Sequence, residues 1–360
     1  MWNRQTSTRT KRGAHWAVPV VGALVAVVLM AAPAAACGGL VGENGTIKLT
    51  HTTTLAAYHD GVERYVTSFE FSGSGKEVGS IVPLPGVPTK VQRGGDWTLQ
   101  RLEREVAPPQ LEFARAAQDA SAGASPAQVI LSTKIDALDI TVLRGGGSAV
   151  GKWATDHGFL LTPDAPEMLD FYANRSPIFM AARFDAERAR RLGQNTGDGT
   201  PIMLTIPTKA PWVPLRILSL GLKRATVVNA DVFLLTDTRP KLLAGGRGLS
   251  LDRNEPANAS LLSDLRSDKG MGWLPSHMWF TFLRLDVPAG QLGYDLAVST
   301  KPDAVPSLTA AGVTAAQAVP IGQSHGRALW PLTAAAVVGV ATFGLASLFG
   351  RRRRTPGVPA

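Results

Sequence analysis

The stretch Thr46-Ile-Lys-Leu-Thr-His-Thr-Thr-Thr-Leu-Ala-Ala57, followed by His59-Asp60-Gly61-Val62, decides the fold class. Its first twelve residues place Ile, Leu and Ala on one face and Lys and Thr on the other, which is typical of a β-strand that buries one face. An Asp-Gly pair tolerates the positive φ angles of a tight turn. Residues 63–71 return with aromatic and threonine side chains on one face. The stretch therefore predicts a β-hairpin.

Strand and helix signals alternate along the rest of the chain. Strands are predicted at residues 135–143, 178–184, 202–207, 215–220, 226–236, 278–287 and 294–298, with an edge strand in the proline-rich residues 81–88. Helices are predicted after a cap at Asp96 and at residues 110–119, 148–157 and 163–173. We therefore expect an α+β fold. Its β-rich domain, residues 37–298, is a sheet or a sandwich with a helical insertion at about residues 96–191, in one large domain or two closely packed halves.

Basic residues are concentrated at the two ends of the chain. The formal net charge is +9, but four bases precede residue 13 and four more follow residue 350. The remainder carries 29 bases and 28 acids, a net charge of +1. A nearly neutral body offers no broad basic surface, so we predict no nucleic-acid binding.

Residues 1–36 have the order of a secretory signal peptide: bases, an apolar run, and small residues ending in Ala34-Ala35-Ala36. A retained membrane helix is the alternative.

Cys37 follows directly after this segment and is the single cysteine, so no intrachain disulfide can form. Cleavage before it would expose the acceptor used in bacterial lipoproteins, although Ala34 stands where such signals carry leucine. Cys37 is thus a candidate lipid-attachment residue; an ordinary mature N-terminus or an unpaired thiol is the alternative.

The C-terminal segment predicts a membrane anchor. Residues 328–350 contain no charged side chain and span roughly 34 Å as a helix, enough to cross a bilayer core of about 30 Å. The basic tail, residues 351–360, predicts the cytoplasmic side by the positive-inside rule. Residues 299–327 are rich in Ala, Pro and Ser, which predicts a flexible stalk. We therefore expect a single-pass membrane protein whose main domain lies outside the cytoplasm.

The glycine-rich run Gly146-x-x-x-x-Gly151-Lys152, between a predicted strand and a predicted helix, approaches a phosphate-binding P-loop. Such a loop needs Ser or Thr after the lysine to hold magnesium, and Trp153 occupies that position. We therefore predict no nucleotide binding. A strand-to-helix turn in which Trp153 packs into the core accounts for the run better.

Histidine spacing gives no metal-binding pattern. The six histidines are His15, His51, His59, His157, His277 and His325. In an extended strand His51 and His59 would be roughly 26 Å apart, too far to share one ion. No pair has the short spacing typical of a metal cluster, so we predict neither a metal nor a cofactor.

No sequence motif points to an enzyme. The chain has no Gly-x-Ser-x-Gly elbow, and its single cysteine lacks the setting of a nucleophile. A Ser-His-Asp site assembled from distant segments around His157 or His277 is the alternative.

Five tryptophans are expected mainly in the core: Trp97, Trp153, Trp212, Trp273 and Trp279. The other interpretation is an exposed aromatic platform that binds glycans or peptides.

Several motifs resemble the bacterial domain-of-unknown-function 2330 family. They are Cys37-Gly-Gly39, Ser80-Ile-Val-Pro-Leu-Pro-Gly-Val-Pro88, Trp153-Ala-Thr-Asp-His-Gly-Phe159, Leu169-Asp-Phe-Tyr-Ala173, Ile178-Phe-Met-Ala-Ala-Arg183 and Pro211-Trp-Val-Pro-Leu-Arg216. The resemblance implies an exported, envelope-associated bacterial protein and no particular activity. Many members carry a second cysteine soon after Cys-Gly-Gly; this chain has none, so an N-terminal disulfide does not carry over.

We therefore expect a non-enzymatic extracytoplasmic domain, anchored in the bacterial cell membrane, that binds or organises an envelope component. Its partner would be a protein, a glycan or a lipid. Two alternatives differ in class. One is an envelope hydrolase with a dispersed site, and the other is a passive partner subunit of another membrane protein.

Overall fold

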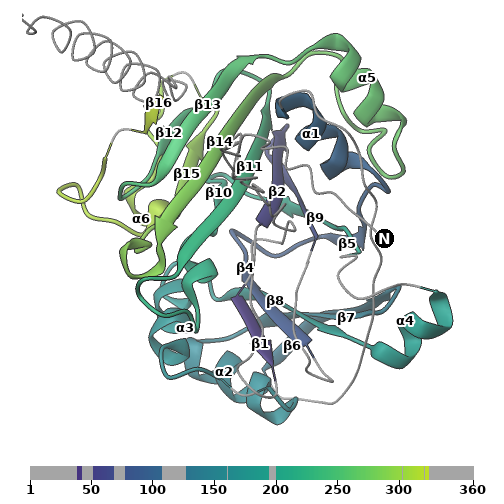
Figure 1. The fold of residues 1–360 in the computed structure, drawn as a ribbon, viewed down its shortest axis with the longest axis vertical. Helices are drawn as coiled ribbons and strands as arrows, with labels where there is room; N and C mark the ends of the chain where they lie inside the picture. Colours follow the sequence, from purple (N-terminus) through teal and green to yellow (C-terminus); the bar gives the residue numbers. More distant parts are fainter. Residues whose placement is uncertain are drawn as a thin grey trace, which may run out of the picture. The chain divides into compact units, whose positions relative to one another are not determined.

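Two large β-sheets face each other around the main hydrophobic core, and helices cover the outer face of each sheet (Figure 1). The computed structural model describes residues 39–42, 52–68, 78–107, 127–159, 161–193, 200–301, 303–319 and 321–323. All of them belong to one unit of the chain, Pro33–Ala360. Across these residues the fold is a β-rich α+β fold, as the sequence predicts.

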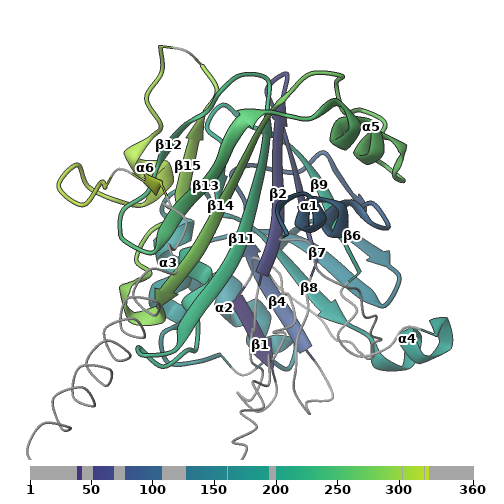
Figure 2. The ribbon, with the colours of Figure 1, turned by 45° about the horizontal axis from the view of Figure 1, so that its top comes forward.

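Three sheets are found among the described residues. The eight-stranded sheet has the order β16-β13-β14-β11-β2-β3-β9-β5, the five-stranded sheet β1-β4-β8-β7-β6, and the three-stranded sheet β10-β15-β12. The strands are β1 Gly39–Gly42, β2 Thr52–His59, β3 Val62–Thr67, β4 Val78–Pro83, β5 Lys90–Arg93, β6 Gln128–Ile135, β7 Leu138–Arg144, β8 Ile178–Phe184, β9 Ile202–Pro207, β10 Trp212–Val213, β11 Val227–Thr236, β12 Lys241–Leu243, β13 Leu249–Pro256, β14 Trp279–Pro288, β15 Leu296–Ser299 and β16 Gly322–Gln323. Figure 2 shows β13, β14 and β11 side by side.

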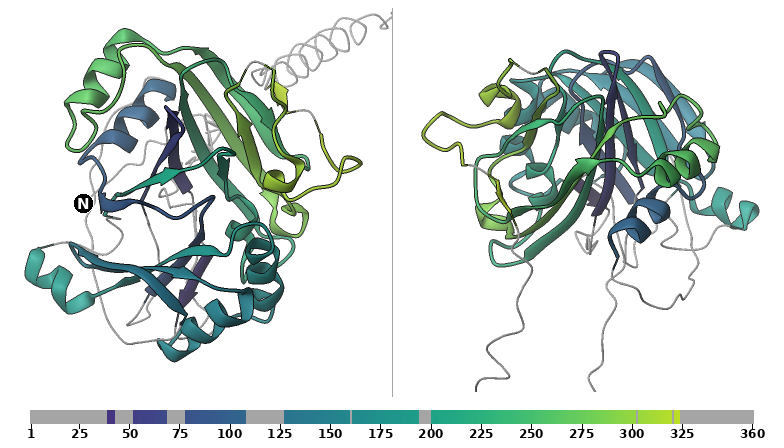
Figure 3. Two further views of the ribbon diagram at one scale, coloured as in Figure 1. Left: turned by 180° about the vertical axis from the view of Figure 1, so that it is seen from behind. Right: turned by 90° about the horizontal axis from the view of Figure 1, so that it is seen from above.

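Six α-helices are found among the described residues. They are α1 Thr98–Val106, α2 Gly147–Asp156, α3 Ala165–Ala173, α4 Ala186–Leu192, α5 Ala259–Ser267 and α6 Leu308–Ala311, with short 3₁₀ helices η1 Arg216–Ser219 and η2 Ala289–Gln291. Apolar residues of α2 and α3 share a cluster with the outward residues of β4, β7 and β8. The helices α1 and α5 lie together in both views of Figure 3. Their apolar residues share a second cluster with residues of β2, β11 and β14.

The predicted hairpin is β2 and β3, joined by a turn in which Asp60 has φ 50° and Gly61 φ 76°. Two positive φ angles in succession match the turn that an Asp-Gly pair favours. The expectation of one buried face is wrong, because Thr52 through Tyr58 are all buried. One face of β2 meets the core between the sheets, and the other meets α1 and α5. Small threonine and alanine side chains fit a strand covered on both sides.

Three further expectations about strands need correction. The predicted strand 135–143 begins at the last residue of β6 and runs through the turn at Asp136, which has φ 47°, into β7. The supposed helical insertion therefore contributes β6, β7 and β8 to a sheet. β4 is an inner strand between β1 and β8, because its ladder ends at Pro83 and the later prolines lie beyond it. Within the predicted strand 215–220, Arg216–Ser219 form the 3₁₀ helix η1.

Part of the expected flexible stalk is folded. Ala310 and Ala311 of α6 are buried against the α2–α3 cluster, and Val319 forms a bridge with Ala244. β16 then adds a short parallel strand to β13. Alternating small and apolar residues in this segment pack against the domain although their composition resembles that of a linker.

Within the described part of the chain, no helix combines the length and the apolar character needed to cross a membrane. Residues 1–36, Cys37, the predicted helix at 110–119, and residues 328–350 and 351–360 all lie outside the described residues. The signal peptide, lipid-attachment and anchor expectations therefore stay predictions.

Asp268 holds the segment that leads into α1, and Asp96, the residue predicted to cap this helix, makes no N-cap hydrogen bond. The Asp268 carboxylate accepts hydrogen bonds from the backbone N–H groups of Asp96 and Trp97, both at 3.0 Å, and from the Thr98 hydroxyl at 2.7 Å. Burial alone would raise the pKa of Asp268, but these hydrogen bonds outweigh it and lower the pKa. A residue 170 positions from Thr98 in sequence thus fixes the chain just before the helix.

We expect Asp268→Ala to destabilise the protein by about 3 kcal/mol, because the N–H groups of Asp96 and Trp97 and the Thr98 hydroxyl lose a charged acceptor. Urea unfolding of the purified protein near neutral pH measures the change. The exposed Asp303→Asn is the matched control and should shift the stability by less than about 0.5 kcal/mol. Equal, small shifts in stability for both variants would show that these hydrogen bonds contribute little.

Candidate functional site: a charged pocket at the strand ends

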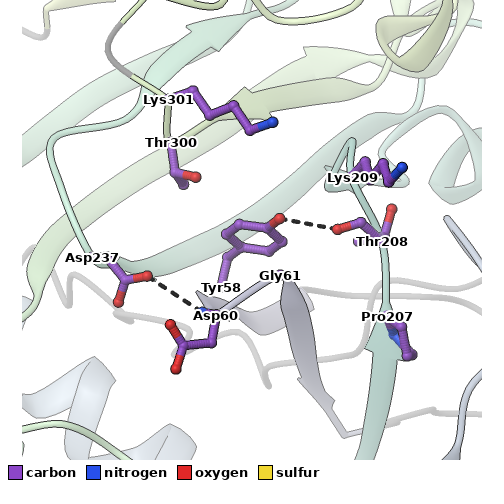
Figure 4. A pocket seen from close by; sticks show the side chains of 9 residues that line it. All are labelled: Tyr58, Asp60, Gly61, Pro207, Thr208, Lys209, Asp237, Thr300 and Lys301. Atoms are coloured by element: carbon purple, nitrogen blue, oxygen red, sulfur yellow. Dashed lines mark hydrogen bonds between the residues drawn. The ribbon is translucent and has the colours of Figure 1, made fainter.

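The carboxyl ends of four strands meet at one edge of the fold and surround a pocket. β2 and β11 run parallel with Tyr58 opposite Thr236, and the end of β9 at Pro207 lies opposite Val62, beside the β2–β3 turn. The segment after β15 completes the wall, tied by a hydrogen bond of 2.8 Å from the Thr238 hydroxyl to the Thr300 carbonyl. The pocket has a volume of about 710 Å³. Its lining residues are Tyr58, Asp60, Gly61, Pro207, Thr208, Lys209, Asp237, Thr300 and Lys301 (Figure 4).

Tyr58 forms the centre of the pocket (Figure 4). Its hydroxyl donates a hydrogen bond of 3.0 Å to the Thr208 carbonyl. Burial, together with the nearby carboxylates of Glu63 and Asp237, raises the pKa of Tyr58. The phenol therefore stays protonated at neutral pH and holds the loop after β9 in place.

On one side of the pocket, two lining carboxylates, Asp60 and Asp237, flank the imidazole of His59, which does not itself line the pocket. His59 Nδ1 lies 2.6 Å from Asp237 Oδ1, and His59 Nε2 lies 3.3 Å from Asp60 Oδ2. The Asp60 backbone N–H adds a hydrogen bond of 3.4 Å to Asp237 Oδ2. Ligand atoms of the three residues lie within 4.8 Å of one another, so together they could hold a cation. Sequence spacing gave no sign of this cluster, because Asp237 is 178 residues from His59.

The other side carries two ammonium groups. Lys209 follows β9 and Lys301 follows β15, and both side chains are exposed. Among the described residues, neither lysine is within ion-pair distance of a carboxylate, whereas Lys152 and Lys134 each pair with an aspartate. The pocket thus has free positive charge on one side and two carboxylates on the other.

A buried carboxyl group lies next to the pocket. Glu63 is opposite Tyr58 in the β2–β3 ladder, on the same face of the sheet, and is fully buried. Burial raises the pKa of Glu63 to about 8, and the backbone N–H of Trp212, which faces the carboxyl, only partly offsets this. No hydrogen bond of standard geometry reaches either oxygen. Glu63 is therefore mostly neutral near pH 7.

The residues singled out from sequence lie elsewhere. His157 stacks on Trp153 with ring centroids 3.6 Å apart, and burial, followed by the charge of Arg183, lowers its pKa. Lys152 of the glycine-rich run pairs with Asp156 at 2.6 Å, and Trp153 is buried, as predicted for a strand-to-helix turn. Neither His157, His277 nor any tryptophan lines the pocket.

Comparison with known proteins gives a family and no activity. No curated protein matches the chain. The crystal structure of baculovirus P35 has 11% sequence identity and a TM-score of 0.32, and the caspase-8/P35 complex has 9% and 0.31. Both matches cover 68% of this chain and 92% of the other, and their low TM-scores carry no argument. Residues 31–241 match a family described as an uncharacterized protein conserved in bacteria, DUF2330. The chain belongs to the DUF2330 family.

Proposed function

We propose that this protein is a non-enzymatic binding module of the bacterial envelope that takes a polar ligand in the strand-end pocket. The observation that carries the proposal is the pocket itself. Its volume of about 710 Å³ falls within the roughly 300–1,000 Å³ typical of ligand sites. Its walls come from loops at the ends of separate strands, so a rigid scaffold positions loop side chains, as is common for binding sites.

The arrangement around His59 favours binding over hydrolysis. A Ser-His-Asp site needs one imidazole nitrogen directed at a nucleophile. Here Nδ1 faces Asp237 and Nε2 faces Asp60. The lining residues include neither serine nor cysteine. Location outside the cytoplasm on a membrane anchor, expected from residues 1–36 and 328–350, supports an envelope component as the ligand.

Thermal shifts of the purified protein test the proposal. The panel contains cell-wall fragments, envelope glycans, lipid headgroups and divalent metals, with a chelator control. A ligand present at 100 times its Kd should add roughly 2.7 kcal/mol of stability. We expect Lys209→Glu combined with Lys301→Glu to abolish the shift, because both exposed ammonium groups border the pocket.

Lys241→Glu is the matched control, because Lys241 is an exposed lysine of β12 that does not line the pocket. It should leave the shift unchanged. A flat panel at millimolar concentrations, or a shift that survives the double variant, would contradict binding at this pocket.

A further inference from the structure

We infer that the ligand is zwitterionic, with its cationic group against Asp60 and Asp237 and its anionic group against Lys209 and Lys301. This inference rests on the proposed function and names the ligand chemistry of the same pocket. Figure 4 shows the two aspartates on one side of the Tyr58 ring, Lys209 on the other, and Lys301 above it. Opposite charges are thus separated across one cavity.

The acidic side keeps a negative charge in either state of His59. The imidazole lies between the carboxylates at 2.6 and 3.3 Å, so a protonated ring neutralises at most one of them. A net charge of −1 or −2 remains at that side. The Asp60 side chain is 85% exposed and the Asp237 side chain 40%, so a ligand can reach both. An ammonium group, which donates up to three hydrogen bonds, matches these acceptors.

The basic side is complementary to a carboxylate or a phosphate. Lys209 and Lys301 have no ion-pair partner among the described residues, and the Thr208 and Thr300 side chains lie beside them. Unpaired ammonium groups at the rim of a pocket attract anions and form charge-assisted hydrogen bonds with them. A purely cationic ligand would leave this side unmatched, and a purely anionic one would leave the acidic side unmatched.

The lining favours a peptide over a lipid. It contains no Leu, Ile, Val or Met side chain that could cover an acyl chain, and its apolar surface is limited to the Tyr58 ring and Pro207, with Gly61. Hydroxyl groups of Thr208 and Thr300 can instead hydrogen-bond with peptide groups. A short peptide with a free amino and a free carboxyl terminus therefore fits the charges and the middle of the pocket.

A set of four tripeptides tests the inference on the full-length protein. Trialanine is zwitterionic at pH 7; N-acetyl-trialanine is anionic, trialanine amide is cationic, and the doubly blocked peptide is neutral. Ligand-observed NMR measures each Kd. We expect each blocked charge to weaken binding about five-fold, so that trialanine binds best and the neutral peptide worst.

Variants assign each charge to its side of the pocket. Asp237→Asn should reduce the advantage of the free amino group and keep that of the carboxylate, and Lys301→Gln should do the reverse. Lys241→Gln is the control and should change neither. Equal Kd values across the four peptides would overturn the zwitterion inference while the proposed binding function stands. Absence of binding by all four peptides, together with a flat thermal-shift panel, would reject both the zwitterion inference and the proposed binding function. Binding of a lipid headgroup alone would reject a peptide as the ligand.

Discussion

Replacing Asp295 with alanine should destabilise the protein by about 3–5 kcal/mol, because it leaves a buried guanidinium and several buried donors without their acceptor. Asp295 is fully buried, and its carboxylate accepts hydrogen bonds from the Tyr172 hydroxyl at 2.8 Å and from the Arg175 guanidinium. The Arg175 guanidinium in turn lies over the rings of Phe171, Tyr172 and Trp212. The loss therefore affects α3, β10 and the start of β15 together.

The same carboxylate explains why Arg216–Ser219 form η1 within the predicted strand 215–220. Asp295 accepts from the backbone N–H groups of Leu215 at 2.7 Å and Arg216 at 2.9 Å, and the Tyr172 hydroxyl accepts from Ile217 at 2.9 Å. Three successive donors are thus satisfied by side chains, so no neighbouring strand is needed. The apolar run is buried as a tight turn.

Urea unfolding midpoints of the purified protein measure the Asp295 effect. Asp295→Asn keeps an oxygen acceptor but loses the charge that faces Arg175, so its destabilisation should fall between wild type and Asp295→Ala. The exposed Asp303→Asn is again the matched control. A change below about 1 kcal/mol for Asp295→Ala would show that the surrounding residues rearrange to replace the carboxylate.

Raising the pH from 5 to 8 should destabilise the wild-type protein relative to Glu63→Gln. The folded-state pKa of Glu63 is raised to about 8, above the value near 4.3 expected in the unfolded chain. Between these values the folded state retains a proton that the unfolded state has released. The contribution of Glu63 to stability is therefore fully present below the lower pKa and decreases by about 1.4 kcal/mol per pH unit up to the higher one.

Chemical denaturation at several pH values compares the two proteins. The amide introduced by Glu63→Gln cannot titrate, so the difference in unfolding free energy should change in favour of the variant by a few kcal/mol between pH 5 and pH 8. The informative quantity is the slope of this difference against pH, because the buried amide also destabilises the folded state by an amount that does not depend on pH. Glu187→Gln, at a side chain that is 74% exposed, is the control and should follow the wild type. Parallel pH profiles for wild type and Glu63→Gln would show that Glu63 ionises normally.

Local sequence patterns predicted those strands and helices whose own apolar residues determine their structure. β8 and β9 have the predicted bounds, because they are short apolar runs between turn residues. β13 was missed: its sequence Leu-Ser-Leu-Asp-Arg-Asn-Glu-Pro has little apolar alternation, and pairing with β14 makes it a strand. α5 was also missed, although its Asn258 cap and its Leu261, Leu262 and Leu265 could have indicated it.

The pocket could not be predicted, because its residues meet only through the sheet topology. Asp237 reaches His59 because β2 lies parallel to β11, a pairing of distant segments that no local spacing indicates. The contacts of Asp268 beside α1 and of Asp295 at η1 could not be predicted for the same reason, because each joins segments that are distant in sequence. Glu63 was not singled out from sequence, because its burial depends on distant segments such as Trp212, whose backbone N–H faces the carboxyl.

β16 has a mechanical consequence. The chain leaves the described domain through a strand of two residues, Gly322 and Gln323, paired in parallel with β13, after the single bridge between Val319 and Ala244. A pulling force applied to the chain beyond Gln323 would load these few hydrogen bonds first. They would open one after another before the force reached α6 and the long β11–β14 ladder. This segment would therefore lengthen under tension and protect the pocket from distortion.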